Sequence, residues 1–170
     1  MKMASFLSMV VATVVLFAAA SASAQAPPAY GTPITLDQAK KAMAGAEAEA
    51  KKNGWPVVIV ILDSGGNLVM LQRLDNAQWG SIDIAKDKAR SAVALRRPTK
   101  VFQDLIAQGG ANLRLLNLGY SVLEGGIPIM ADGKVIGGIG VSGVTSQQDA
   151  QIGQAGIDAR PAGKIGRAHV

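Results

Sequence analysis

The chain has 170 residues, of which 49% are hydrophobic and only 4% aromatic, with a formal net charge of +5 and no cysteine. The absence of cysteine excludes disulfides, thiol nucleophiles and lipid attachment through cysteine. Without Lys2 and two charges near the C-terminus, Lys164 and Arg167, the net charge falls to +2, and no basic run is interleaved with aromatic residues, so nucleic-acid binding has little support.

The N-terminal segment, residues 1–24, has the pattern of a secretory signal peptide. Lys2 precedes an apolar run over residues 6–20, and Ala22 and Ala24 form a small-x-small cleavage pattern. The alternative is a retained membrane anchor, but the run is short for a spanning helix. Cleavage after Ala24 would leave 146 residues, enough for one domain. We therefore expect a protein that is periplasmic or secreted, with no membrane attachment after cleavage.

A leader over residues 25–34 precedes the first predicted helix. Thr35 and Gln38 have the spacing of a capping box, in which each side chain satisfies a backbone amide at the start of a helix. Small apolar residues then recur at helical spacing until Asn53 and Gly54 supply a stop signal.

The first predicted hairpin follows this helix. Residues 57–62 form an unbroken run of β-branched and aliphatic side chains, residues 63–67 are typical of a turn, and residues 68–73 continue as a second strand.

Two helices are predicted after the hairpin. Ser81 is expected to cap the first, which ends at Pro98 because the residue before a proline disfavours helical geometry. Thr99 is expected to cap a shorter helix that stops at Gly109 and Gly110.

A second hairpin is predicted in the C-terminal half. Residues 113–118 are expected to add one helical turn, and residues 120–123 a short strand. Within residues 125–143, Asp132 and Gly133 separate two apolar runs, which is a strong hairpin signal because both turn positions favour positive φ.

The last predicted helix begins with a capping box formed by Ser146 and Asp149 and extends to about Ala159. Tight hairpins force antiparallel neighbours, so the predicted class is α+β, with helices covering an antiparallel sheet of about five strands. Residues 161–170 are interpreted as a tail. One back-translation of residues 164–170 reads as a common sequencing adapter, which points to an assembly artefact and leaves His169, the only histidine, a poor catalytic candidate.

Glycines dominate the end of the second hairpin. Gly138, Gly140 and Gly143 match the spacing of a dinucleotide-binding motif, but that motif opens a parallel βαβ unit, and here the preceding strand is the second arm of a hairpin. We expect instead a strand that another backbone or a ligand approaches closely. The two hairpins and their helices would then form a crevice with a floor of bare main chain.

The order of elements and the residues between them resemble the GlcG/HbpS-like family, which is related to the C-terminal domain of PduO-type proteins. The similarity extends over residues 35–160, and it rests on these residues: 36–39, 62–68, Arg73 with Asp75, Lys88 with Ala89, 125–129, and 138–143 with Asp149. The resemblance implies profilin-like α/β/α layers, homo-oligomers and, for several exported members, binding of haem or a related tetrapyrrole.

The available side chains restrict the chemistry. Without cysteine or a native histidine, nucleophilic triads and the usual zinc ligands are absent. Three carboxylates are candidates for acid and base roles: Asp63 is otherwise a turn residue and Asp149 a helix-cap partner, whereas Glu124 has no obvious structural task.

Residues that match family positions are candidates for ligand binding. Arg73 and Lys88 are expected to reach a crevice and pair with an anionic group such as a haem propionate, although solvated surface charge is the competing interpretation. Backbone and side-chain groups beside them complete the candidate ligand-binding set: Glu124, Gly125, Gly126, Ser142 and Gly143.

Haem iron generally takes His, Cys, Met or Tyr as an axial ligand. Tyr120 is the best candidate here, although packing is a competing role. The other available side chains are Tyr30, Met43, Met70 and Met130.

Three functions are compatible with these observations. The first is an exported haem-binding or tetrapyrrole-binding protein. The second is an enzyme or sensor that acts on a small organic acid held by Arg73, Lys88 and Glu124. The third is a structural module whose glycine-rich edge serves oligomer packing.

Overall fold

The computed structural model describes residues 26–160, so the predicted signal peptide and C-terminal tail lie outside the described residues. Four α-helices, one 3-10 helix and four strands follow in this order: α1 (Leu36–Asn53), β1 (Val58–Asp63), β2 (Leu68–Arg73), α2 (Ser81–Leu95), α3 (Lys100–Ala107), the 3-10 helix η1 (Gly110–Leu118), β3 (Gly126–Ala131), β4 (Lys134–Ser142) and α4 (Ser146–Asp158). Within this part of the chain, no helix has the length and apolar character needed to cross a membrane.

The four strands form one antiparallel sheet in the order β2-β1-β4-β3. Both predicted hairpins are present, and they join side by side where β1 pairs with β4, from Val58 opposite Ser142 to Asp63 opposite Gly137. At the second turn Asp132 and Gly133 have φ values of 48° and 72°, as the hairpin signal requires. The predicted α+β class is therefore confirmed.

The predicted fifth strand is wrong, because residues 120–123 form bends and irregular structure instead. The outer edge of β3 offers no continuous ladder for another strand. Thr99 takes both outer hydrogen bonds of Gly126, since its hydroxyl accepts from the Gly126 amide at 2.9 Å and its own amide donates to the Gly126 carbonyl at 2.9 Å. Pro128, two residues further along this edge strand, has no amide hydrogen to donate.

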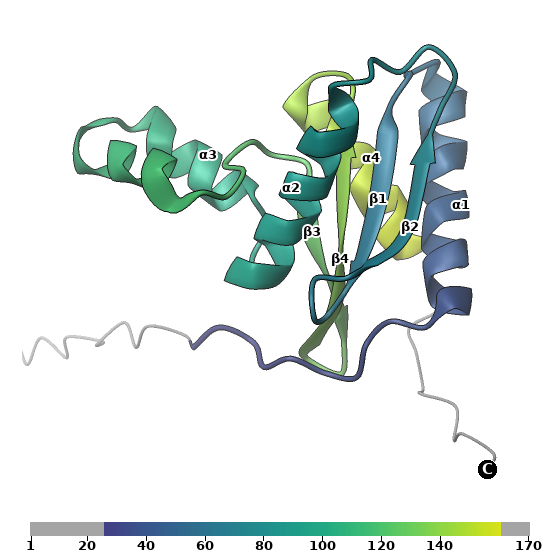
Figure 1. Ribbon diagram of the computed structural model, residues 1–170, viewed down its shortest axis with the longest axis horizontal. Helices are drawn as coiled ribbons and strands as arrows, with labels where there is room; N and C mark the ends of the chain where they lie inside the picture. Colours follow the sequence, from purple (N-terminus) through teal and green to yellow (C-terminus); the bar gives the residue numbers. More distant parts are fainter. Residues whose placement is uncertain (1–25, 161–170) are drawn as a thin grey trace, which may run out of the picture.

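Helices cover both faces of the sheet, as the α/β/α layering requires. Helices α1 and α4 pack on each other and on one face, whereas α2 covers the other (Figure 1). Strand β1 is buried on both sides: Ile59 and Ile61 belong to the core under α1 and α4, and Val58 and Val60 to the core under α2. This double burial explains why its sequence is continuously apolar.

Helix α3 and η1, residues 100–118, pack on each other and extend away from the sheet on the left of Figure 1. We call these residues the arm. The leader runs below the sheet along the bottom of Figure 1, and Tyr30 there forms an isolated bridge with Val135 of β4.

Local signals at the helix ends are confirmed at α1 and displaced by one residue at α4. Thr35 and Gln38 form the predicted capping box, and Gly54 ends α1 in the left-handed conformation with φ 68°. The second capping box uses Thr145 and Gln148, one residue earlier than predicted, which releases Asp149 for a different contact.

Two predicted caps are wrong because tertiary contacts engage the side chains. Ser81 is the first residue of α2, and its hydroxyl accepts a hydrogen bond from Ser142 on β4 at 3.2 Å. Thr99 precedes α3 but makes no side-chain cap, because its hydroxyl binds Gly126.

The glycine segment of β4 is covered by α2. A Cβ at Gly140 would lie 2.1 Å from the Ala85 carbonyl oxygen, and one at Gly138 would lie 2.6 Å from the Val93 side chain. The expected close approach of another backbone to these glycines is therefore confirmed. The expected open crevice floor is wrong at these positions, because α2 covers them. The rejection of a dinucleotide site is consistent with β4, which is antiparallel to both of its neighbours.

Candidate functional site

The candidate residues do not converge on one crevice. Arg73 is exposed and lines a hollow of about 490 Å³ beside the C-terminal end of α1. Glu124, Gly125 and Gly126 line a second hollow, of about 380 Å³, between the start of β3 and α4. Tyr120 lies between two further hollows, of about 350 and 300 Å³, along α2.

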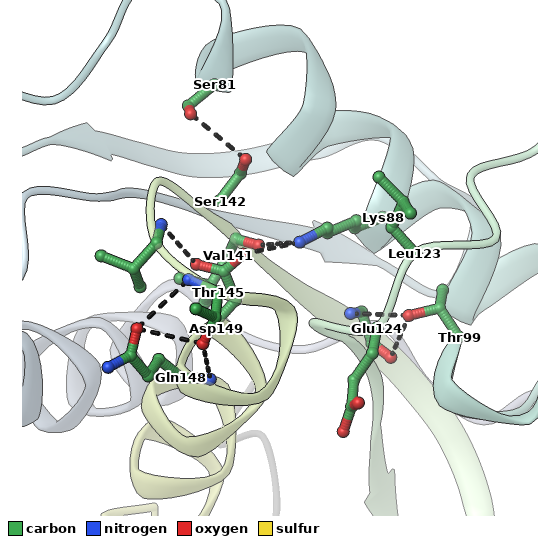
Figure 2. Close-up of polar contacts among 12 residues, drawn as sticks. Ser81, Lys88, Thr99, Leu123, Glu124, Val141, Ser142, Thr145, Gln148 and Asp149 are labelled. Atoms are coloured by element: carbon green, nitrogen blue, oxygen red, sulfur yellow. Dashed lines mark hydrogen bonds and ion pairs between the residues drawn. The ribbon is translucent and has the colours of Figure 1, made fainter. Parts of the chain in front are cut away.

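Lys88 is buried, with 2% of its surface exposed, and forms an ion pair inside the protein. Its ammonium lies 2.7 Å from Asp149 Oδ2 and donates to the Val141 carbonyl at 3.0 Å, so it connects α2 to both β4 and α4 (Figure 2). Asp149 Oδ1 accepts from the Val144 amide at 3.3 Å. The Lys88 ammonium is thus engaged by the chain itself, and its pairing with an anionic ligand stays a prediction.

Burial determines the electrostatics of this pair. It raises the pKa of the Asp149 carboxyl above its ordinary value, although Lys88 and the nearby backbone amides act in the opposite direction. A charged side chain in such a position requires a partner of opposite charge, because an isolated buried charge is very unfavourable. Lys88 and Asp149 therefore depend on each other.

Gly125 is required where the chain passes this ion pair. A Cβ at this position would lie 2.8 Å from Lys88 Nζ and 2.9 Å from the Val141 carbonyl oxygen, and φ is +122°. Only glycine adopts this conformation readily and also leaves room for the ammonium. Gly125 thus separates the buried pair from the hollow that contains Glu124.

Glu124 is buried, with 7% of its surface exposed. Its backbone amide donates to Gln103 Oε1 at 2.9 Å, and its carboxylate accepts a long hydrogen bond of 3.4 Å from Gln103 Nε2. In Figure 2 the Glu124 carboxylate and the Lys88 ammonium point in different directions. Glu124 thus lines the second hollow, and its carboxylate forms no ion pair with Lys88, which is paired with Asp149.

Ser142 and Gly143 contribute to packing at the end of β4. The buried Ser142 hydroxyl donates to Ser81, and a Cβ at Gly143 would lie 2.4 Å from the Pro56 carbonyl oxygen. A larger side chain at Gly143 would therefore disturb the fold itself.

Tyr120 is half-buried and lies where residues from three distant segments meet. One adjoining hollow has a mixed lining that includes Ile84, Leu116 and Asp87, whereas the other includes Tyr30 and Arg90. The Arg90 guanidinium lies 5.3 Å from the centre of the Tyr120 ring. This arrangement combines an oxygen donor, a cation and apolar surface along one face of α2.

Arg90 was not among the candidate residues that the sequence indicated. Tyr30 was placed in the leader as one of the available axial ligands, and its contacts were not anticipated: its hydroxyl donates to the Val93 carbonyl at 3.0 Å, and its ring packs beside Arg96. No local signal connects these residues, because the contacts bring together the leader, α2 and the segment after η1.

Metal binding by several side chains has no support in residues 26–160, where no group of three or more His, Cys, Asp or Glu residues gathers. A metal-containing cofactor that takes a single ligand from the protein does not need such a group of side chains, and the Tyr120 oxygen is a suitable single ligand.

Comparisons with known proteins agree with this architecture. A family model described as "Haem degrading protein HbpS-like" matches residues 34–158. Protein GlcG of Escherichia coli is 40% identical over 113 residues, which cover 65% of this chain and 84% of GlcG.

Two solved structures extend the comparison. The crystal structure of a PduOC:heme complex superposes with a TM-score of 0.70 at 30% identity, covering 78% of this chain and 98% of that one. The crystal structure of a double mutant of Streptomyces reticuli HbpS superposes with a TM-score of 0.69 at 34% identity, covering 83% of this chain and 97% of the other.

Proposed function

Because the chain belongs to the HbpS-like family, we propose that it is a haem-binding protein that holds its ligand at Tyr120. The observation that carries this proposal is the position of Tyr120 between two hollows on α2, with Arg90 against its ring. The heme complex of the related PduOC domain supports the choice of ligand.

The residues around Tyr120 fit the chemistry of a haem. The Tyr120 oxygen would ligate the iron, and the Arg90 guanidinium would pair with a propionate. Apolar side chains of the adjoining hollow would contact the macrocycle: Ile84, Leu116, Val122 and Leu123. When bound, haem would supply an iron centre that can bind oxygen or carry an electron.

Titration with hemin tests the proposal. We expect a saturable shift of the Soret band for the unmodified protein, and at least about ten-fold weaker binding with loss of the tyrosinate signature for Tyr120→Phe, since the ring stays but the donor oxygen is lost. Tyr30→Phe is the matched control, because it removes a hydroxyl that already donates to Val93. We expect it to keep the tyrosinate signature.

Two outcomes would contradict the proposal at different levels. If the unmodified protein gives no saturable Soret shift, haem is not the ligand. If Tyr120→Phe binds hemin like the unmodified protein, haem binds but Tyr120 does not ligate it.

We also propose that the protein is exported, on the basis of the signal-peptide pattern in residues 1–24. Intact-mass measurement of protein recovered from the periplasm or the medium should give a chain that begins at Gln25. Recovery of the full-length chain in the cytoplasm would contradict export.

The proposed assembly is a homo-oligomer, as the family resemblance implies. The arm offers a surface for it, because Leu113 and Leu118 are 50% and 46% exposed. Clustered exposed apolar side chains on a soluble protein commonly mark an interface.

A further inference from the structure

The hollow that contains Glu124 is separate from the proposed haem site. Its volume is about 380 Å³, and it shares no lining residue with the two hollows beside Tyr120. It lies between the start of α3, the start of β3 and α4, on the other side of Gly125 from the buried Lys88. It therefore provides space for a second, smaller ligand.

Glu124 is the unusual group in this hollow. The residue is only 7% exposed, yet among the described residues its carboxylate has one hydrogen bond, of 3.4 Å, from Gln103. A buried carboxylate normally has a cationic partner or several hydrogen bonds, because its desolvation is costly. The structure thus contains an anionic acceptor whose capacity is largely unused.

Two lysines lie beside this hollow, and both are already paired. Lys100 lines the same hollow, but its ammonium lies 2.8 Å from Asp104 Oδ1. Lys88 lies behind Gly125 and is paired with Asp149 at 2.7 Å. Since each ammonium is engaged by its own carboxylate, Glu124 is the charged group of the hollow that has no ion pair of its own among the described residues.

The backbone holds Glu124 in place. Its amide donates to Gln103 at 2.9 Å, and the amide of Gly126 donates to the Thr99 hydroxyl at 2.9 Å. These contacts connect the start of β3 and the residue two positions before it to the α2–α3 connection and to α3. The carboxylate is therefore positioned before any ligand arrives, which lowers the entropic cost of binding.

We propose that this hollow binds a small organic ammonium ion. The ammonium donates hydrogen bonds to the Glu124 carboxylate, and the apolar part of the ligand lies against Ile127, Ala150 and Pro98. Charge-assisted hydrogen bonds in a partly dehydrated site favour such a ligand. The same charge disfavours a small organic acid here, because two carboxylates would face each other.

Calorimetric titration with three probes of similar shape tests the proposal: isobutylammonium chloride, isobutanol and sodium isobutyrate at equal ionic strength. We expect saturable binding of isobutylammonium and at least about ten-fold weaker binding of the other two, since only the ammonium can form the charged hydrogen bonds. Equal binding of all three probes, stronger binding of isobutyrate or no binding of isobutylammonium would overturn the proposal.

Variants locate the site. Glu124→Gln keeps the shape and removes the charge, so we expect at least about ten-fold weaker isobutylammonium binding. Glu47→Gln is the matched control, because Glu47 is a carboxylate in the separate hollow beside Arg73, and we expect it to leave binding unchanged. Unchanged binding in Glu124→Gln, or loss of binding in Glu47→Gln, would overturn the assignment.

A second variant covers the case in which Glu124→Gln fails to fold. Ala150→Leu adds bulk to the wall of the hollow on α4 and leaves the carboxylate in place. We expect it to block isobutylammonium while hemin still shifts the Soret band as in the unmodified protein. If isobutylammonium binds to Ala150→Leu with unchanged affinity, the ligand does not occupy this hollow and the proposal is wrong.

Discussion

The ion pair between Lys88 and Asp149 is the buried contact on which three elements depend. It joins α2 to α4 across the end of β4, and the Val141 carbonyl accepts a further hydrogen bond from the same ammonium. Because both side chains are almost fully buried, neither charge can be rehydrated if its partner is removed. Removal of either partner is therefore expected to be strongly destabilising, because it leaves the other charge buried and unpaired.

We predict that Asp149→Asn lowers the free energy of unfolding by about 3–5 kcal/mol, because it leaves the Lys88 charge buried without compensation. The double variant Lys88→Met, Asp149→Asn should recover most of this loss, since no buried charge remains. Urea unfolding measures both values. The control is Asp104→Asn in the exposed pair with Lys100, which should cost less than about 1 kcal/mol. A similar loss of unfolding free energy in Asp149→Asn and Asp104→Asn would contradict the argument.

The sequence predicted the positions of these residues better than their contacts. Lys88 was assigned to a helix beside an apolar residue, which is correct, but its partner lies 61 residues away. Local spacing assigned Asp149 to a capping box, whereas Thr145 and Gln148 supply that box. Capping rules operate over four residues, so they cannot reveal which side chain is used across the core.

At the scale of elements, the contact between α2 and β4 depends on residues without side chains. The helix backbone lies directly on the strand, so that a Cβ at Gly140 would lie 2.1 Å from the Ala85 carbonyl oxygen and 2.5 Å from the Ala89 amide nitrogen. The small side chains of Ala85 and Ala89 make this approach possible. An added methyl group must therefore displace the helix.

We predict that Gly140→Ala lowers the free energy of unfolding by about 3 kcal/mol, because overpacking of a rigid contact forces backbone movement. Gly80→Ala is the matched control. Gly80 precedes α2 with φ −62°, and a Cβ there has no atom within 4 Å, so the change should stay within about 1 kcal/mol. Denaturant unfolding of both variants gives the comparison, and an equally stable Gly140→Ala would show that α2 can move without cost.

Hairpins and helix ends were predictable where a local signal specifies them. Asp132 and Gly133 form the expected turn because their backbone conformation is required by the two-residue connection. Thr99 was assigned as a helix cap, but it binds the edge of β3 instead, and this contact helps to exclude the expected fifth strand. Such competition between a cap and a tertiary contact is invisible in the sequence.

At the scale of the whole molecule, the two predicted hairpins form one sheet because β1 pairs with β4. The sequence predicted each hairpin locally, but it did not indicate which strands would meet in the centre. That pairing buries the glycines of β4 beneath α2, separates Arg73 from Glu124 and leaves the candidate residues in different hollows. The sequence therefore could not predict whether the candidate residues would lie in one crevice, because this depends on how distant strands pair.

The arm gives the last prediction, which concerns assembly. Its leucines Leu113 and Leu118 are 50% and 46% exposed, and neither lines the hollows beside Tyr120. If these side chains are buried between copies of the chain, the double variant Leu113→Glu, Leu118→Glu should shift the mass measured by light scattering from oligomer to monomer, because buried unpaired carboxylates are unfavourable. Leu68→Glu is the control, since Leu68 is 56% exposed on β2, away from the arm. A monomeric unmodified protein would contradict assembly altogether, whereas dissociation by Leu68→Glu alone would locate the interface on the sheet edge instead of the arm.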